Sequence, residues 1–364
     1  MQRLSIDFLR PEMIAAAEVL DPQGRVLIRA GGAIQESHIK ALVDGGFKSA
    51  YVELPRFTAA VPDSLIGGDT QKEAVKLIRQ VYEDFRSKAE VDSGPIRDFA
   101  SRLVNQVVVN RTTVFETVDI RPIEDYLPGH VLNVAVLSIL IGLKSEYTPT
   151  RLHELALGAL LMDIGEMAVP QDILKKADKL TPAEMTEVKK HPELGFDGLR
   201  KKIRGLPTPA MHVAYQHHES FDGSGYPRGI ASSEIHEYAR IAAVADMFDA
   251  LLSDRPFRHY YLPSEAASIL QLFAGKILDP EMVSRLLSQV ALYPKGSLVE
   301  VDSGELAEVE SVEHANPSRP KLRLLTDAWG NRIKDPDNLD LSKQRSRKIV
   351  KVFKDQEIME WITK

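Results

Sequence analysis

The chain has 364 residues, a net charge of −6 and no cysteine. This length is sufficient for two or three domains, and the charge gives no argument for binding nucleic acid or an anionic membrane. The absence of cysteine excludes disulfides, thiolate metal sites and a cysteine nucleophile. A metal bound to this chain would therefore need nitrogen and oxygen ligands, which suit iron, manganese or zinc better than an iron–sulfur cluster.

The N-terminal segment MQRLSIDFLRPEM has no long apolar core and carries acidic residues, unlike a signal peptide. The longest apolar run, Val131–Leu143, is interrupted by Asn133 and Ser138 and is too short to span a bilayer. We therefore expect a soluble, cytoplasmic protein that does not associate with membranes.

Residues 1–60 have the pattern of a small α+β domain. Ala16–Leu20 and Arg25–Arg29 flank a Pro-Gly turn and predict a β-hairpin. Gln35–Gly45 predicts a short helix that ends at a Gly-Gly pair, and Ala50–Leu54 predicts a further strand.

Residues 61–118 read as a linker followed by a helical hairpin. Val61–Asp69 is the expected linker, and Thr70–Val91 and Ile96–Thr117 carry apolar residues at helical spacing. The hairpin could form a dimer seam, which would make the protein a homodimer, or it could simply pack against the main domain. The sequence leaves both alternatives open.

Residues 119–293 are mostly helical, and two of their apolar stretches contain acids. Asp163 and Glu166 interrupt Ala159–Val169, which predicts one apolar helix broken at these positions. Asp246 and Asp249 interrupt a second apolar helix, Ile241–Arg258. A buried carboxylate is costly unless it is paired or binds a metal, so these acids indicate a polar centre inside a helical bundle.

Four dispersed histidines belong to the same region. His130 stands at the start of the helical run Gly129–Leu143, and His191 directly precedes a proline. His217 and His218 end a helical stretch in the segment YQHHESFDGSGYPRG, whose Gly- and Pro-rich part predicts a tight loop. Adjacent imidazoles are good metal ligands, although the same pair alone is equally compatible with a solvent-exposed position.

From residue 294 onward the pattern becomes β-rich. Short strands are expected at Ser297–Val301, Ala307–Val312, Lys321–Leu325 and Ile349–Phe353, and a short helix at Gln356–Ile362. A basic cluster precedes the last strand and favours a solvated face over a nucleic-acid site; it comprises Lys343, Arg345, Arg347 and Lys348.

Several segments together resemble one family. They are MDIGE, where the family has HDIGK, then HPELG, HHESFDGSGYPRG and ARIAAVADMFDALLSDRPFR, all in the family's order and spacing. Over Glu124–Tyr293 the chain is similar to the HD-GYP proteins, the branch of the HD phosphohydrolases that hydrolyses cyclic di-GMP. The resemblance implies a mainly α fold, with an HD-type helical bundle flanked by the two smaller domains.

The resemblance also implies roles for individual residues. One metal would be held by His191, His217 and His218, with Asp163 as a bridge to a second metal held by His130 and Asp246. The catalytic positions would be Asp163 and Glu166. Substrate contacts would come from Gly225, Tyr226, Asp249, Arg255 and Arg258. The two arginines could instead form salt bridges with Asp249 or Asp254. One or two divalent ions per chain are expected, with iron or manganese favoured and zinc also compatible.

Three positions depart from the family pattern. Met162 replaces the histidine of the HD motif, Glu166 replaces a lysine that would face the substrate phosphate, and Tyr126 stands where some members have a metal-binding glutamate. On a continuous helix, Glu166 would lie one turn from Met162 on the same face and could take over the vacated coordination position. Drift after loss of catalysis explains the same changes, and we favour drift or repurposing.

The sequence therefore supports three hypotheses. The first is a divergent HD-GYP protein of bacterial cyclic di-GMP signalling, with weak or lost phosphodiesterase activity, that acts by binding a guanine nucleotide or a protein partner. The second is an active metal-dependent phosphodiesterase with an altered site. The third is an interaction scaffold that binds neither metal nor nucleotide.

Overall fold

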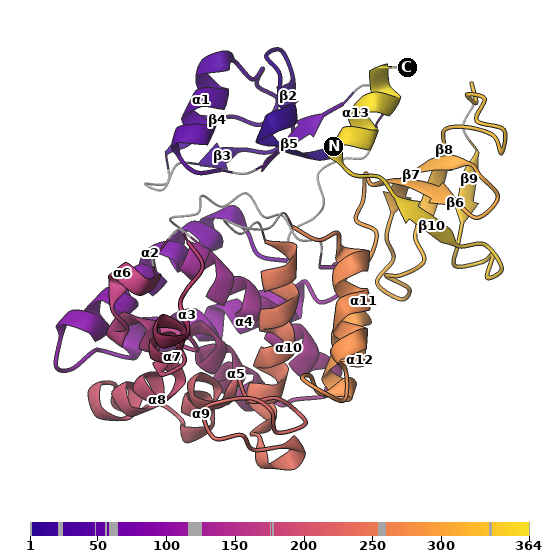
Figure 1. The fold of residues 1–364 in the computed structure, drawn as a ribbon. Coiled ribbons are helices and arrows are strands. Elements are labelled where there is room, and N and C mark those ends of the chain that lie inside the picture. Colours follow the sequence, from indigo (N-terminus) through magenta and orange to yellow (C-terminus); the bar gives the residue numbers. More distant parts are fainter. Residues whose placement is uncertain are drawn as a thin grey trace.

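The computed structural model describes residues 2–20, 25–47, 49–54, 57, 65–115, 126–174, 176, 178–253, 260–334 and 337–363. A helical bundle forms the larger part of the molecule, and two small β-containing units lie beside each other at one end of it (Figure 1). The expected mainly α architecture with two flanking units is confirmed.

The N-terminal unit is an antiparallel sheet of order β1-β5-β2 with one helix and one hairpin. Its elements are β1 (Gln2–Ser5), the 3-10 helix η1 (Ile6–Phe8), β2 (Ile14–Ala15), β3 (Val19–Leu20), β4 (Val26–Ile28), α1 (Glu36–Asp44) and β5 (Ser49–Glu53). The β3–β4 hairpin, α1 and β5 match the sequence expectation. Strands β1 and β2 were not expected.

Helices α2 (Gly68–Ser87) and α3 (Gly94–Val109) belong to the hydrophobic core of the main bundle. Ile78 and Phe85 of α2, like Phe99 of α3, are almost fully buried in that core. Simple packing against the main domain therefore accounts for their apolar faces. The expected helix Ile96–Thr117 is too long, because α3 ends at Val109 and the chain turns at Asn110.

The central helix of the bundle is α4 (Tyr126–Lys144), which packs against α2, α3, α5, α10 and α12. Around it stand α5 (Pro149–Leu160), α6 (Gln171–Leu174), α7 (Pro182–Val188), α8 (His191–Lys202), α9 (Thr208–Gln216), α10 (Glu237–Leu252), α11 (Pro263–Phe273) and α12 (Pro280–Leu287). The stretch Leu127–Lys144 is longer than the apolar run read from the sequence, and by length and composition it could cross a membrane. Here 78% of it is buried inside the protein.

The apolar helix expected over Ala159–Val169 is broken, as its acidic residues indicated. Helix α5 ends at Leu160, Met162 and Asp163 lie in a turn, and a 3-10 helix, η3, spans Ile164–Ala168. The α-helical spacing that would place Glu166 one turn from Met162 on the same face is therefore absent, and that expectation is wrong.

The C-terminal unit is a five-stranded antiparallel sheet of order β10-β6-β7-β8-β9. It comprises β6 (Leu298–Val301), β7 (Leu306–Ser311), β8 (Lys321–Leu324), β9 (Asn338–Asp340) and β10 (Ile349–Val352), followed by α13 (Asp355–Thr363). All but β9 were expected. Within the basic cluster, Arg347 forms ion pairs with Asp302 and Glu305.

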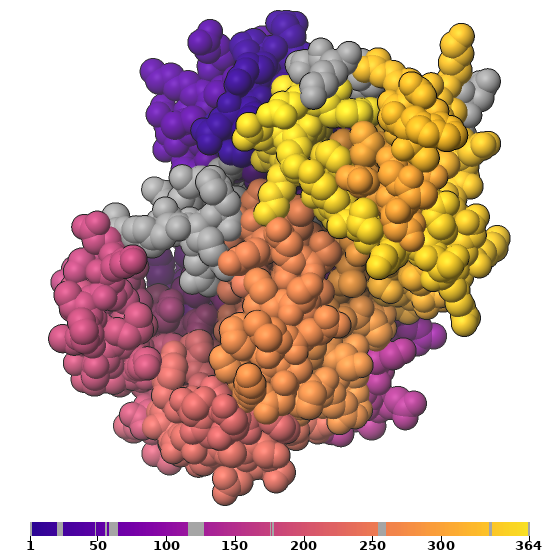
Figure 2. Space-filling view, turned by 45° about the vertical axis from the view of Figure 1, so that its right-hand side comes forward, coloured from indigo at the N-terminus to yellow at the C-terminus, as the bar shows by residue number. Residues whose placement is uncertain are grey.

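The two small units share one hydrophobic core. Leu4 and Val52 of the N-terminal sheet belong to the same buried cluster as Ile358 of α13, and Trp361 stands edge-on to Phe57 with the ring centroids 6.0 Å apart. Figure 2 shows the C-terminal segment, in yellow, lying directly against the N-terminal unit, in indigo. The contact joins residues from the two ends of the sequence.

Candidate metal centre

Four side chains from separate elements meet inside the bundle. They are Asp163, from the turn before η3, His191, the first residue of α8, and His217 and His218, directly after α9. One ligand atom from each lies within 4.8 Å of the ligand atoms of the other three. Asp163, His191 and His217 are buried, and His218 is half-buried.

Helix α5 is held against α9 by Gly158. A side chain at this position would come within 2.7 Å of the carbonyl oxygen of Ala210 and 2.6 Å of Val213. The two helices can approach closely only because Gly158 has no Cβ atom. This contact brings the turn after α5, with Asp163, next to the end of α9, with His217.

Backbone carbonyls fix the orientation of two of the histidine rings. Nδ1 of His191 donates to the carbonyl of Val188 at 2.9 Å, and Nδ1 of His217 donates to the carbonyl of Val213 at 3.0 Å. In the neutral rings the lone pair is therefore on Nε2, the atom that points inward. The two Nε2 atoms are 3.3 Å apart, so in the neutral state two lone pairs would face each other.

A positive charge between these rings would relieve that repulsion. Asp163 Oδ1 lies 3.3 Å from Nε2 of His217 and 3.6 Å from Nε2 of His191. Burial alone would raise the pKa of Asp163, but His217, His191 and His130 hold it well below its usual value. Burial opposes a charge on His217, yet Asp163 raises the pKa of this imidazole above its ordinary value.

The other two histidines of the cluster stay neutral near pH 7. Burial and the charge on His217 lower the pKa of His191, and the same two causes lower the pKa of His218 to about 3. Two neutral imidazoles, one imidazole that shares its proton with a carboxylate, and one ionised carboxylate form a donor set of three nitrogens and one oxygen. This set suits a divalent ion such as Zn²⁺, Fe²⁺ or Mn²⁺.

A second group adjoins the cluster around His130 on α4. Its Nε2 lies 3.0 Å from Asp246 Oδ1 and 3.9 Å from Asp163 Oδ2, and its Nδ1 lies 2.7 Å from Asp249 Oδ2. Asp249 also accepts a hydrogen bond of 2.6 Å from Asn133 and is 1% exposed. Asp246 is thus at the site, and the buried Asp249 holds the His130 ring; its contact with a substrate stays a prediction.

The loop after His218 closes over one side of the cluster. The ring of Tyr226 stacks on His218 with centroids 4.9 Å apart, and its amide donates to the carbonyl of His218 at 3.1 Å. A side chain on Gly225 would come within 2.1 Å of the amide nitrogen of Ser220, so this position requires glycine. Both loop residues named from the sequence therefore lie beside the candidate metal ligands.

Glu219 is an organising residue of this loop that sequence reasoning missed. Its buried carboxylate accepts hydrogen bonds from the amides of Arg228 and Gly229, each at 2.9 Å, and from Ile230 at 3.2 Å. The available signal was an acid directly after the two histidines and before a run of glycines. Three amide donors to one carboxylate hold the loop in shape.

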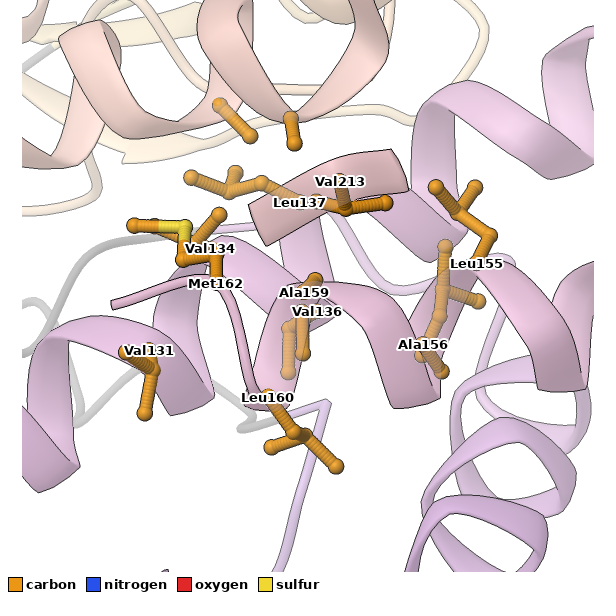
Figure 3. Close-up of a cluster of buried hydrophobic side chains, with 14 of the residues drawn as sticks. Val131, Val134, Val136, Leu137, Leu155, Ala156, Ala159, Leu160, Met162 and Val213 are labelled. Carbon is orange, nitrogen blue, oxygen red and sulfur yellow. The ribbon is translucent and has the colours of Figure 1, made fainter. Parts of the chain in front are cut away.

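Met162 and Glu166 do not join the four candidate ligands. Met162 is 1% exposed and lies among Val131, Val134 and Leu137 in the hydrophobic core (Figure 3). Glu166 is half-buried and close enough for its charge to contribute to the raised pKa of Tyr226, after burial, Asp163 and Asp246. Arg255, Arg258 and the side chain of Tyr126 lie outside the described residues.

Comparison with known proteins gives matches to two family models. A model described as "HD domain" matches residues 111–282, and one described as "KOW domain associated with HD domain" matches residues 298–360. The first contains every described residue of the candidate metal centre. The second corresponds to the C-terminal sheet and most of α13.

Curated relatives are named as phosphodiesterases of cyclic dinucleotides, some of cyclic di-GMP and others of 3'3'-cGAMP. The chain is 31% identical over 248 residues to "Cyclic di-GMP phosphodiesterase PA4108" of Pseudomonas aeruginosa, covering 68% of this chain and 59% of the relative. It is 40% identical over 147 residues to "Cyclic di-GMP phosphodiesterase response regulator RpfG" of Xanthomonas campestris, covering 40% and 38%. The matches thus span less than two thirds of these relatives.

A solved structure, "Bd1817, a HDG"Y"P protein from Bdellovibrio bacteriovorus", is also similar. It is 20% identical, with a TM-score of 0.48, and the match covers 78% of this chain and 97% of the other.

Proposed function

Because this chain belongs to the HD-GYP branch of the HD phosphohydrolases, we propose that it is a divergent member that binds one divalent metal and a cyclic guanine dinucleotide. Its hydrolysis of the phosphodiester is weak or lost. In this role it acts in cyclic di-GMP signalling by binding the nucleotide or a protein partner.

The observation that carries the proposal is the four-residue cluster. The Nδ1 atoms of His191 and His217 are committed to carbonyls, so both Nε2 atoms are available to a cation beside Asp163. His218 adds a third nitrogen and is stacked on Tyr226. When bound, the ion supplies positive charge to a phosphoryl oxygen of the nucleotide.

The residues at two positions of the HD motif, Met162 and Glu166, support weak hydrolysis. Met162 is packed into the hydrophobic core and offers a soft, neutral thioether, a poor ligand for a hard divalent ion. Glu166 adds negative charge near Tyr226, where a phosphate would be repelled. The group around His130 and Asp246 therefore lacks one imidazole that a second metal would use.

The test is made on the full purified chain in three measurements: metal content, calorimetric binding of cyclic di-GMP, and release of linear pGpG. We expect one metal per chain, binding in the presence of metal, and little pGpG. Cyclic di-AMP is the control ligand, because adenine lacks the O6 acceptor and N1–H donor of guanine.

The other two hypotheses predict different results. Two metals per chain with rapid release of pGpG would establish an active phosphodiesterase with an altered site. No metal and no heat with near-millimolar nucleotide would contradict the proposal and leave an interaction scaffold.

A further inference from the structure

Lys189 lies beside the loop that covers the metal centre. Its Nζ is 5.0 Å from the centroid of the Tyr226 ring, and Tyr226 is itself stacked on His218. This ammonium group and a candidate metal ligand therefore contact the same aromatic ring. The family resemblance read from the sequence assigned no role to Lys189.

The backbone at Lys189 is fixed by the same segment that positions His191. Lys189 directly follows α7, and its amide donates to the carbonyl of Met185 at 3.0 Å. The preceding residue, Val188, supplies the carbonyl that orients the His191 ring. The base of the Lys189 side chain is thus held relative to the cluster, while the side chain itself is exposed to solvent.

Three carboxylates near Tyr226 create negative charge that the ammonium group of Lys189 can offset. Asp163, Asp246 and Glu166 all place negative charge near the Tyr226 ring. Among the residues that the structure describes, Lys189 forms no ion pair with a carboxylate, whereas its neighbour Lys190 is paired with Glu187 at 2.6 Å. A cation–π contact of an exposed lysine is weak and can be exchanged for a phosphate oxygen.

We propose that Lys189 is the cation that binds a phosphate of the nucleotide at the mouth of the metal centre, in place of the lysine that Glu166 has replaced. This inference rests on the proposed function. It identifies Lys189 as the residue that recognises the negative charge of the nucleotide. The metal and Lys189 together offset the charge of Glu166, so that binding persists although the HD motif has diverged.

The test compares Lys189→Gln with Lys190→Gln, a matched variant one residue away whose charge is already paired. Calorimetry with cyclic di-GMP is run on the metal-loaded full chain at several salt concentrations. We expect Lys189→Gln to weaken binding about tenfold and to make binding less sensitive to salt, because one screened charge–charge contact with a phosphate is lost. Lys190→Gln should match the parent, and Lys189→Arg should keep most of the affinity.

The metal content of each variant separates binding from structure. It should be the same in the parent and in Lys189→Gln. If Lys189→Gln retains the parent's affinity and salt slope, the inference is wrong while the proposed function stands. Loss of metal from this variant would also contradict it, because the lysine would then act through His191. A parent that binds no cyclic di-GMP would overturn both.

Discussion

Gly165 of η3 and Gly195 of α8 lie in direct contact where these two elements pack against each other. A methyl group on Gly165 would come within 2.5 Å of the backbone nitrogen of Gly195 and within 2.0 Å of the carbonyl oxygen of His191. These neighbours are backbone atoms, which cannot rotate away as a side chain can. The distance between Asp163 and His191 therefore depends on the absence of a side chain at Gly165.

Replacement of Gly165 by alanine should damage both stability and metal binding. We expect Gly165→Ala to lower the free energy of unfolding by about 3 kcal/mol, since overpacking that moves backbone is at the costly end of its range. Urea denaturation and metal content are the measurements. Gly68→Ala is the matched control, because a methyl group there meets no atom within 4 Å. Equal behaviour of the two variants would contradict the packing argument.

Metal removal should destabilise the bundle, and His191→Ala should abolish the effect. A ligand at 100 times its dissociation constant stabilises the native state by about 2.7 kcal/mol, so adding metal to the chelated parent should raise its Tm. His191→Ala removes one of the three imidazoles and should show little metal-dependent shift. His314→Gln, a change in the C-terminal unit, should respond as the parent does. An equal shift in all three proteins would place the metal elsewhere.

Metal affinity should rise with pH until His217 is deprotonated. Its pKa is raised above the ordinary value of 6.5 because the nearby Asp163 outweighs the effect of burial, and a metal must displace that proton. Below this pKa, log K should increase by about one unit per pH unit, and above it log K should level off. Titrations with metal from about pH 5.5 to about pH 8.5 would measure this. A flat profile would show that no imidazole proton is exchanged.

Restoring the HD motif should raise hydrolysis. The double variant Met162→His, Glu166→Lys supplies an imidazole and a phosphate-facing cation, and each 1.4 kcal/mol of added transition-state stabilisation is about tenfold in rate. We expect at least a tenfold increase in pGpG release. A parent already as fast as the double variant would instead indicate that Glu166 is a working catalytic group.

The single variant Met162→His has a separate expectation. Because Met162 is buried among apolar side chains, a histidine there should cost about 1–3 kcal/mol of stability in the metal-free protein. Added metal should recover part of this loss. Met185→His, at an exposed methionine, is the control and should change neither stability nor its response to metal.

Replacement of Asp249 by alanine should lower the free energy of unfolding and leave the metal content of the protein unchanged. Asp249→Ala removes the acceptor of both His130 and Asn133, and breaking a buried charged pair costs about 3 kcal/mol. The four-residue cluster does not include Asp249, so its metal should remain. Asp222→Ala, at an exposed carboxylate, serves as control in the same denaturation experiment. Loss of metal from Asp249→Ala would show that the two groups act as one.

The sequence predicted elements whose signals are local. The helix at Gln35–Gly45 and the helical stretch ending at the His217–His218 pair depend on spacing and end residues within a few positions, and both are present. A break near Asp163 was expected from the acids in this apolar run, but the change from α-helix to 3-10 helix was not, because it depends on packing against α8. The carboxylate of Glu219 was missed because its partners lie nine to eleven residues further along a folded loop.

Contacts between distant segments left no such signal. Nothing in the composition of residues 356–362 distinguishes a helix on the C-terminal sheet from one that completes the N-terminal core. Likewise, the proximity of Lys189 to Tyr226 depends on the approach of α7 to a loop that lies beyond two intervening helices.

The core shared by the two small units sets an order of events during synthesis. Leu4, Leu42 and Val52 precede the helical bundle in the chain, yet part of their cover, Ile358 and Met359, is translated only after the bundle. The N-terminal unit therefore lacks this part of its cover until the bundle and the C-terminal sheet have been synthesised. Such delayed, long-range closure slows folding and exposes the intermediate to aggregation, so this protein should depend on holding chaperones more than the compactness of its bundle suggests.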